Sequence, residues 1–254
     1  MTAPPPHFHD DPPRFVTSRL LEDIGLPHLF TTRHFPGVVK PTERRPPFGP
    51  EAAPLLAARG LRAPAAFARQ VHGAVVLRAE RGGLAGHGDA LSTTRPGLPL
   101  VISTADCLPI VLYDPRAGRL AAVHAGWRGT VQSVARAAVA DLVAAGSAVA
   151  DLVVAIGPSI GPCCYEVDAP VLERLEAAFP DGWEAWVTPK GPGKWMLDLW
   201  RANQDQLTAA GVRPGRIEAL GLCTGCRPDL LFSYRRERGA GRLVTVAALP
   251  ERAC

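Results

Sequence analysis

The sequence lacks a long apolar run and an excess of charge of one sign. No segment is long and apolar enough to cross a bilayer, and residues 1–13 carry three consecutive prolines and two acids where a signal peptide needs an apolar stretch. We therefore expect a cytoplasmic protein without a membrane partner. The net charge is only +4 and the basic residues are scattered, whereas a nucleic-acid binder normally carries a dense basic stripe. A small-molecule substrate is the better expectation.

What the chain does contain is ample material for a core. Apolar residues make up 47% of the 254 positions and charged residues 20%, which is typical of a globular protein. This length is at the upper end for one hydrophobic core, and nothing like a linker divides it. We expect residues 1–13 to form a disordered Pro-rich tail and residues 14–254 to form a single catalytic domain, a monomer.

The middle of the chain predicts three strands in succession. Two β-branched and apolar runs, 99–104 and 108–113, are separated by three residues that end at Cys107. A turn at 114–118 leads into a third run that ends at His124. Both side chains are thus expected at strand ends.

Thr130 is expected to cap a helix that buries Val131, Val134, Ala138 and Leu142 and ends at Gly146. The remaining predicted elements are a strand over 151–157, helices over 168–179 and 198–211, a strand over 217–222, and a hairpin whose strands flank 237–241. Helices and strands alternate, yet several strands are hairpin-like neighbours. The pattern predicts an α+β fold, a single domain with mixed β-sheets flanked by helices.

Three donors could form a catalytic metal site. His72 and His124 each precede a glycine by one or two residues, which lets the backbone turn and project the ring into a pocket. Cys107 supplies a thiolate, and two imidazoles with one thiolate suit zinc with a fourth position open for a reactant. Spacing alone equally allows a buried structural cysteine and two hydrogen-bonded histidines.

Seven segments carry a resemblance: RQVHG, GDALST, ADCLPIVLYD, VHAGWRGTV, AIGPSIGPCCYEV, LDLWRANQDQL and LFSYRRERGAGR. Together, and in this order, they resemble the laccase-domain family, whose members are variously described as polyphenol oxidase, purine nucleoside phosphorylase and peptidoglycan editing factor. The resemblance implies a one-domain enzyme with catalytic zinc on His72, Cys107 and His124. The segment 34–50 departs from the family's glycine-rich N-terminal pattern, which leaves one pocket wall and substrate choice open.

The resemblance implies purine nucleoside chemistry: phosphorolysis of adenosine, inosine and methylthioadenosine, and adenosine deamination. Copper is the alternative metal, but a multicopper oxidase needs on the order of ten imidazoles, whereas this chain has seven histidines, two of them in the expected tail. Zinc would lower the pKa of bound water for deamination. For phosphate, the turn around Arg128 offers a guanidinium and backbone donors before a helix, although a surface arginine in a tight turn fits equally well.

Other activities fit the same residues. A peptidoglycan-editing amidase would release L-serine from a muramyl precursor, and a metal-independent hydrolase would use Cys107 as nucleophile and His124 as base. A non-catalytic binding or metal-storage protein is disfavoured by the open fourth position.

Four further positions need an assignment. Asp106 is expected to orient a ligand histidine or move a proton, with simple turn capping as the alternative. Gln70 and Trp127 are assigned to substrate binding. Cys223 and Cys226 have metal-site spacing, but a closed site needs a second pair and Cys163-Cys164 is vicinal, so we expect buried or incidental thiols.

Overall fold

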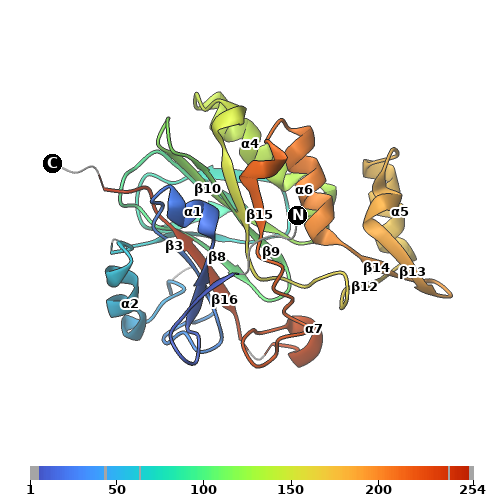
Figure 1. The fold of residues 1–254 in the computed structure, drawn as a ribbon, viewed down its shortest axis with the longest axis horizontal. Helices are drawn as coiled ribbons and strands as arrows, with labels where there is room; N and C mark the ends of the chain where they lie inside the picture. Colours follow the sequence, from blue (N-terminus) through green and yellow to red (C-terminus); the bar gives the residue numbers. More distant parts are fainter. Residues whose placement is uncertain (1–5, 43–44, 63, 240, 252–254) are drawn as a thin grey trace.

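Two mixed β-sheets with helices on their outer faces form the body of the computed structural model (Figure 1), which describes residues 6–42, 45–62, 64–239 and 241–251. The α+β prediction is therefore confirmed. The first sheet has seven strands, in the order β1 (His7–His9), β2 (Phe15–Thr17), β3 (His28–Thr31), β16 (Leu243–Ala247), β8 (Leu100–Thr104), β4 (Ala66–Arg69) and β6 (Gly83–His87).

The second sheet has six strands, in the order β15 (Ile217–Ala219), β11 (Val153–Ile156), β9 (Leu108–Asp114), β10 (Arg119–Ala125), β7 (Ala90–Thr93) and β5 (Val76–Arg78). A small third sheet, β12 (Glu166–Asp168), β14 (Lys194–Leu197) and β13 (Val187–Gly191), projects from the body beside α5 (Ala169–Ala178; Figure 1).

Alternate side chains of strand β10 pack into two different hydrophobic cores, one on each face of the sheet. Ala121 and Val123 pack in the cluster that contains α4 (Val134–Ala144) and α6 (Leu199–Ala209). Leu120 and Ala122 point the other way, into the cluster shared by the two sheets. Successive side chains of a strand point to opposite faces, so a run buried on both faces reads as continuously apolar.

The other helices are short. They are α1 (Arg19–Asp23), α2 (Ala53–Ala58), α3 (Trp127–Val131), α5 (Ala169–Ala178) and α7 (Tyr234–Glu237), with 3₁₀ turns at Pro50–Ala52, Val149–Asp151, Trp183–Trp186 and Pro214–Arg216. Within the described residues, none of the helices has the length and apolar character needed to cross a membrane.

The helix predicted to start at Thr130 is interrupted. Thr130 lies inside α3, where its hydroxyl accepts a hydrogen bond from Asn203 at 3.0 Å, and Ser133 breaks the helix with a φ of 59° before α4 begins. The capping prediction is therefore wrong, because a buried tertiary hydrogen bond takes the hydroxyl. The apolar face from Val134 to Leu142 is buried as expected.

The predicted C-terminal hairpin is also wrong. Its second arm is β16, but β16 pairs with β3 and β8, which are distant in sequence. The first arm contains helix α7 instead, because Ser233 accepts a hydrogen bond from the backbone N–H of Arg236 and caps that helix.

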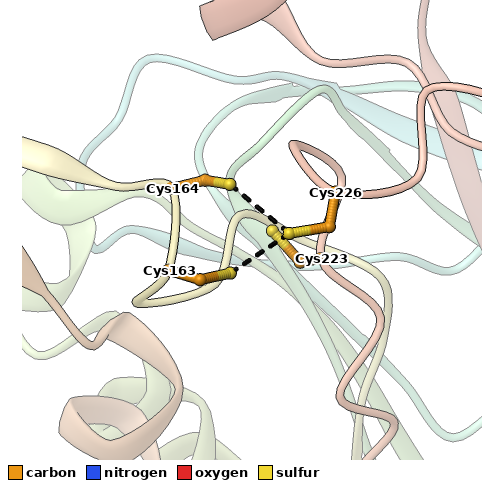
Figure 2. Close-up of side chains that lie close together, drawn as sticks. All are labelled: Cys163, Cys164, Cys223 and Cys226. Carbon is orange, nitrogen blue, oxygen red and sulfur yellow. Dashed lines mark hydrogen bonds between the residues drawn. The ribbon is translucent and has the colours of Figure 1, made fainter.

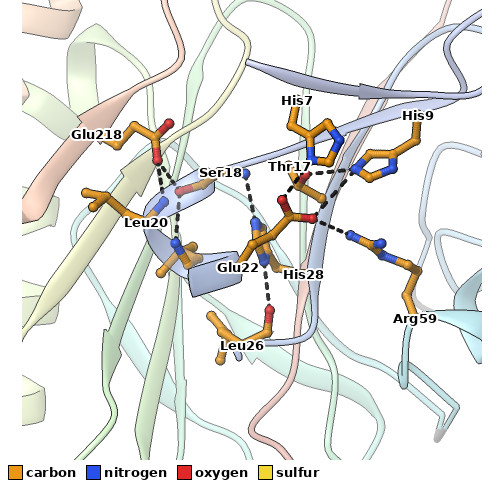
Figure 3. Close-up of polar contacts among 11 residues, drawn as sticks. His7, His9, Thr17, Ser18, Leu20, Glu22, Leu26, His28, Arg59 and Glu218 are labelled. Atoms are coloured by element: carbon orange, nitrogen blue, oxygen red, sulfur yellow. Dashed lines mark hydrogen bonds and ion pairs between the residues drawn. The ribbon is translucent and has the colours of Figure 1, made fainter. Parts of the chain in front are cut away.

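The described part of the expected tail contains a short strand. Strand β1 pairs with β2, and His7 hydrogen-bonds Glu22 at 2.9 Å (Figure 3). Burial raises the pKa of Glu22, but hydrogen bonds from His7 first, and also from Arg59, lower it to about 2. Backbone pairing and this ionic network therefore contact residues 7–9 of the expected tail, while residues 1–5 lie outside the described residues.

Candidate functional site

The three predicted ligands lie where the chain passes from one sheet to the other. His72 lies between β4 of the first sheet and β5 of the second, and Cys107 lies between β8 of the first and β9 of the second. His124 follows Leu120 and Ala122 at period 2, so it faces the space between the sheets near the end of β10. Two crossovers and one strand end therefore bring the three side chains together.

The donor atoms of His72, Cys107 and His124 all lie within 4.8 Å of one another. The two imidazole rings meet edge to face, with 4.8 Å between their centroids. His124 is buried, Cys107 is half-buried and His72 is exposed, so the group runs from the interior to solvent. This arrangement leaves one side of the three donors accessible to a reactant.

The backbone is unusual where it supports the site. His72 has a φ of 61° and Asp106 a φ of 91°, a region that costs residues with a side chain about 1–3 kcal/mol and is often found at functional sites. Gly126 is required for a different reason. A Cβ there would lie 2.8 Å from the sulfur of Cys107 and 3.3 Å from Cδ2 of His72. The cradle around the donors has no room for a larger residue.

Asp89 orients the site, and it was not among the predicted site residues. Its buried carboxylate accepts hydrogen bonds from Nδ1 of His124 at 2.8 Å and from the backbone N–H groups of His72 at 2.9 Å and Gly73 at 2.7 Å. With Nδ1 donating to Asp89, Nε2 of His124 is left with its lone pair for a metal, the usual arrangement of a ligand histidine. The sequence signal that could have identified Asp89 is an acid that follows a glycine in the GDALST segment, just before a buried strand.

The donors also perturb one another's pKa values. Burial raises the pKa of the Cys107 thiol, but hydrogen bonds with His124 and His72 outweigh it and lower the value to about 6. Burial lowers the pKa of His124, while Asp89 and Cys107 raise it to about 9. The sulfur is therefore ready as a thiolate at neutral pH, the form that binds metal or attacks a carbonyl.

The donor set fits zinc on this geometry. Two imidazoles and one thiolate converge, a carboxylate fixes one ring from behind, and the exposed side leaves a fourth position. Copper(II) accepts the same donors, so the residues do not select between the two metals.

A cavity of about 970 Å³ opens in front of the donors. Gln70, Ser103 and Tyr234 line it together with the three donors, and its cationic side chains are Lys40, Arg69 and Arg242. Apolar lining comes from Phe67 and Leu84. The cavity thus combines a reactive end, positive charge and apolar surface.

Asp106 and Gln70 have structural partners. The Asp106 carboxylate accepts hydrogen bonds from the Thr224 hydroxyl and from the backbone N–H of Arg235, both at 2.6 Å. The carboxylate expected from Asp106 behind a histidine is supplied by Asp89. The Gln70 amide pairs with the backbone N–H and C=O of Ser103, at 2.9 and 2.8 Å, so it braces the cavity wall.

Trp127 and Arg128 lie beside the site, outside the set of described residues that line the cavity. The exposed guanidinium of Arg128 stacks on the Trp127 ring, 4.5 Å from its centroid. Burial raises the pKa of Tyr165, as does the charge of Cys107, while Arg235 and Arg128 oppose that rise. Arg128 is therefore close enough to Tyr165 for its charge to be felt there.

Comparison with known proteins places these observations in a family. The family described as Multi-copper polyphenol oxidoreductase laccase matches residues 51–250. A purine nucleoside phosphorylase of Deinococcus radiodurans is 38% identical over 242 residues, covering 91% of this chain and 92% of that one. Adenosine deaminase RL5, from an unknown prokaryotic organism, is 40% identical over 148 residues, covering 58% and 56%.

Geobacillus stearothermophilus supplies both a sequence and a structural relative. Its purine nucleoside phosphorylase YlmD is 42% identical over 158 residues, and the match spans 61% of this chain and 58% of that one, less than two thirds of its length. The crystal structure of YlmD from the same species superposes with a TM-score of 0.85 at 30% identity, covering 97% of this chain and 100% of that one. The fold is therefore shared over nearly the whole chain.

Proposed function

The chain belongs to the multi-copper polyphenol oxidoreductase laccase family, and from that premise we propose that it is a zinc-dependent purine nucleoside phosphorylase. The proposed substrates are adenosine, inosine and methylthioadenosine, with adenosine deamination as a second reaction. One observation carries the proposal: His72, Cys107 and His124 converge at a cavity of about 970 Å³, within the 300–1,000 Å³ range usual for small-molecule sites. The relatives named as phosphorylases and as a deaminase support it.

Zinc at this site would polarise a substrate oxygen or nitrogen and lower the pKa of a bound water. The protein's part is to hold the donors. Asp89 fixes the His124 ring and, through three backbone N–H groups, the turn that carries His72. Gly126 keeps the approach to Cys107 clear.

Phosphate is proposed to bind at the cationic part of the cavity. Phosphorolysis forms a bond from a phosphate oxygen to C1′ of the ribose and breaks the bond from C1′ to the base, which leaves carrying a proton. Phosphate must therefore lie beside the sugar, and Lys40, Arg69 and Arg242 bring positive charge to the cavity lining. Guanidinium groups bind phosphate in a bidentate fashion, which also fixes its orientation.

The purine is proposed to lie against the apolar lining. Phe67 and Leu84 line the cavity, and Tyr234 lines it with 58% of its surface exposed. Stacking on an aromatic ring such as those of Phe67 and Tyr234 contributes about 1–3 kcal/mol per base. The exposed Tyr234 ring is available to cover a bound base.

The test combines product analysis with a pair of arginine variants. Adenosine and phosphate incubated with the zinc-loaded protein should give adenine and ribose 1-phosphate, and Cys107→Ala should abolish both metal retention and turnover. Arg242→Ala should raise KM for phosphate at least 10-fold, while Arg128→Ala, outside the cavity lining, serves as the matched control. If Arg128→Ala raised KM for phosphate more than Arg242→Ala did, the phosphate site would have to be placed beside Trp127. Full activity of Cys107→Ala would contradict the zinc mechanism.

A second candidate is favoured by the pKa of Cys107, which is about 6. A metal-independent hydrolase would use this thiolate as nucleophile and His124 as the acid that protonates the leaving group. Release of L-serine from a seryl-muramyl nucleotide by chelator-treated protein would support it. Loss of all turnover after chelation, with recovery on adding zinc, would favour the phosphorylase.

A further inference from the structure

A second group of metal-type side chains lies away from His72, Cys107 and His124. Its members are Cys163, Cys164, Cys223 and Cys226, hereafter the four-cysteine cluster. Incidental thiols were expected here, because a vicinal pair lacks the usual ligand spacing. The fold nevertheless brings the two pairs together, since all four sulfurs lie within 4.8 Å of one another (Figure 2).

The spacing of the sulfurs matches a tetrahedral ion. Zinc–sulfur bonds of about 2.3 Å in a tetrahedron place the sulfurs about 3.8 Å apart. The sulfur of Cys226 lies 3.4 Å from that of Cys163 and 3.5 Å from that of Cys164. Figure 2 shows the side chains of the vicinal pair directed toward Cys226, with the sulfur of Cys223 beside it. Small outward shifts make room for an ion at the centre.

Two loops bring these sulfurs together independently of a metal. Ser159 N donates to the carbonyl of Leu222 at 3.1 Å, and Thr224 N donates to the carbonyl of Ser159 at 3.0 Å, which joins the loops as a parallel bridge. Within the second loop, Cys226 N donates to the Cys223 carbonyl at 3.2 Å. The convergence of the thiols is therefore fixed by backbone pairing, and the site is largely preformed.

One backbone donor favours a thiolate at Cys223, and one glycine leaves room for the side chain of Cys164. The backbone N–H of Gly161 donates to the sulfur of Cys223 at 3.2 Å, a bond that stabilises negative charge on sulfur. A Cβ at Gly225 would lie 2.7 Å from Cβ and 2.8 Å from the sulfur of Cys164, so only glycine fits there. Cys163 and Cys226 are exposed, which gives an ion access from solvent.

We propose that the four-cysteine cluster is a structural zinc site, closed by four thiolates and distinct from the candidate catalytic site. Four sulfur donors leave no open position, which is the hallmark of a structural rather than a catalytic zinc. The ion binds as each thiol releases its proton, and no electron is transferred. Zinc there ties the loop that carries Thr224, which hydrogen-bonds Asp106, to the loop that carries the vicinal cysteines.

Reciprocal variants of the full chain separate the two metal sites. Zinc-loaded, dialysed wild type is expected to hold two zinc ions per chain, Cys107→Ser one and Cys226→Ser one. In Cys107→Ser, X-ray absorption at the zinc edge should show four sulfur neighbours at about 2.3 Å. Its cobalt-loaded form should show intense sulfur-to-cobalt charge-transfer bands that are lost when Cys226→Ser is added.

The zinc that each variant retains also shows whether the variant is folded. Cys226→Ser should retain the zinc of the other site and its circular dichroism, and Gly225→Ala, which keeps all four thiols, should weaken zinc binding at the cluster at least 10-fold. The inference is overturned if Cys107→Ser holds no zinc or a zinc with fewer than four sulfurs. It is also overturned if the mass of the unreduced protein is lower by two hydrogens for each disulfide, because that loss would show that the cysteines form disulfides. None of these results depends on nucleoside turnover, so the proposed function is tested separately.

Discussion

Replacing Asp89 by Asn removes one charge from the interior while preserving the size of the side chain. In the wild type, one oxygen of the carboxylate accepts from His124 Nδ1 and from the His72 backbone, and the other accepts from the backbone N–H groups of Val71 and Gly73, at 3.2 and 2.7 Å. Asparagine has one oxygen to offer. Whichever way the amide turns, one pair of donors faces an NH₂ group.

The expected cost follows from that count. A fully buried donor without an acceptor costs about 1–3 kcal/mol, and the backbone donors here are partly buried, so the two lost bonds of Asp89→Asn should lower the free energy of unfolding by about 2 kcal/mol, the lower end of that range. The loss of orientation of His124 should weaken metal binding 10- to 100-fold, equivalent to about 1.4–2.7 kcal/mol, as for other partners of ligand histidines.

Two measurements and one control test this reasoning. Zinc Kd is measured by chelator competition on folded protein, and stability by urea unfolding of the metal-free chain. Asp114→Asn is the matched control: its buried carboxylate accepts from the backbone of Arg116 and Ala117, but it lies at the far end of β9, about 20 Å from Cys107. Both of these bonds end on one oxygen of Asp114, so asparagine can keep them, and that variant should show a smaller loss of stability than Asp89→Asn and the wild-type zinc Kd. Wild-type zinc affinity in Asp89→Asn would refute the role given to this carboxylate.

Three other outcomes follow from the structure. Gly126→Ala should weaken zinc binding at least 10-fold in the same competition assay, because its Cβ would lie 2.8 Å from the sulfur of Cys107; unchanged affinity would show that the cradle can widen. Burial lowers the pKa of His28 from 6.5 to about 4, so the unfolded chain takes up the proton first as the pH falls. The free energy of unfolding should therefore decrease by up to about 3 kcal/mol as the pH drops through this window. Urea unfolding of His28→Asn at the same pH values should lack this decrease. Leu142→Ala should cost about 2–5 kcal/mol in urea unfolding, whereas Val143→Ala, at a position 43% exposed, should cost under about 1 kcal/mol; equal losses would contradict the assigned helix face.

Local patterns in the sequence located the strands and their ends well. The runs around Cys107 and before His124 form β8, β9 and β10, within one or two residues of the expected bounds. Apolar β-branched runs are informative because a strand buried on both faces tolerates little else. The fold class followed from the alternation of such runs with helices.

Features decided by distant contacts were missed. Pairing of β16 with β3 and β8 spans more than 130 residues, and no local turn signal announces it. Asp89 acts on His124 across 35 residues, so its role is visible only once β7 and β10 lie side by side. The convergence of the four cysteines was not predicted for the same reason, because the spacing of Cys163 and Cys164 describes one loop and not the second loop that it meets.

Strand β16 has a consequence for how the chain is made. It follows every other described strand in sequence, yet it lies near the middle of the seven-stranded sheet, between β3 and β8. Until β16 has been synthesised, β3 and β8 each have an edge of unpaired backbone groups. Such edges promote aggregation with neighbouring chains. A chain that ends before Leu243 would lack β16, so its first sheet would be divided between β3 and β8. Such a product is a substrate for chaperones and proteases rather than a partly active enzyme.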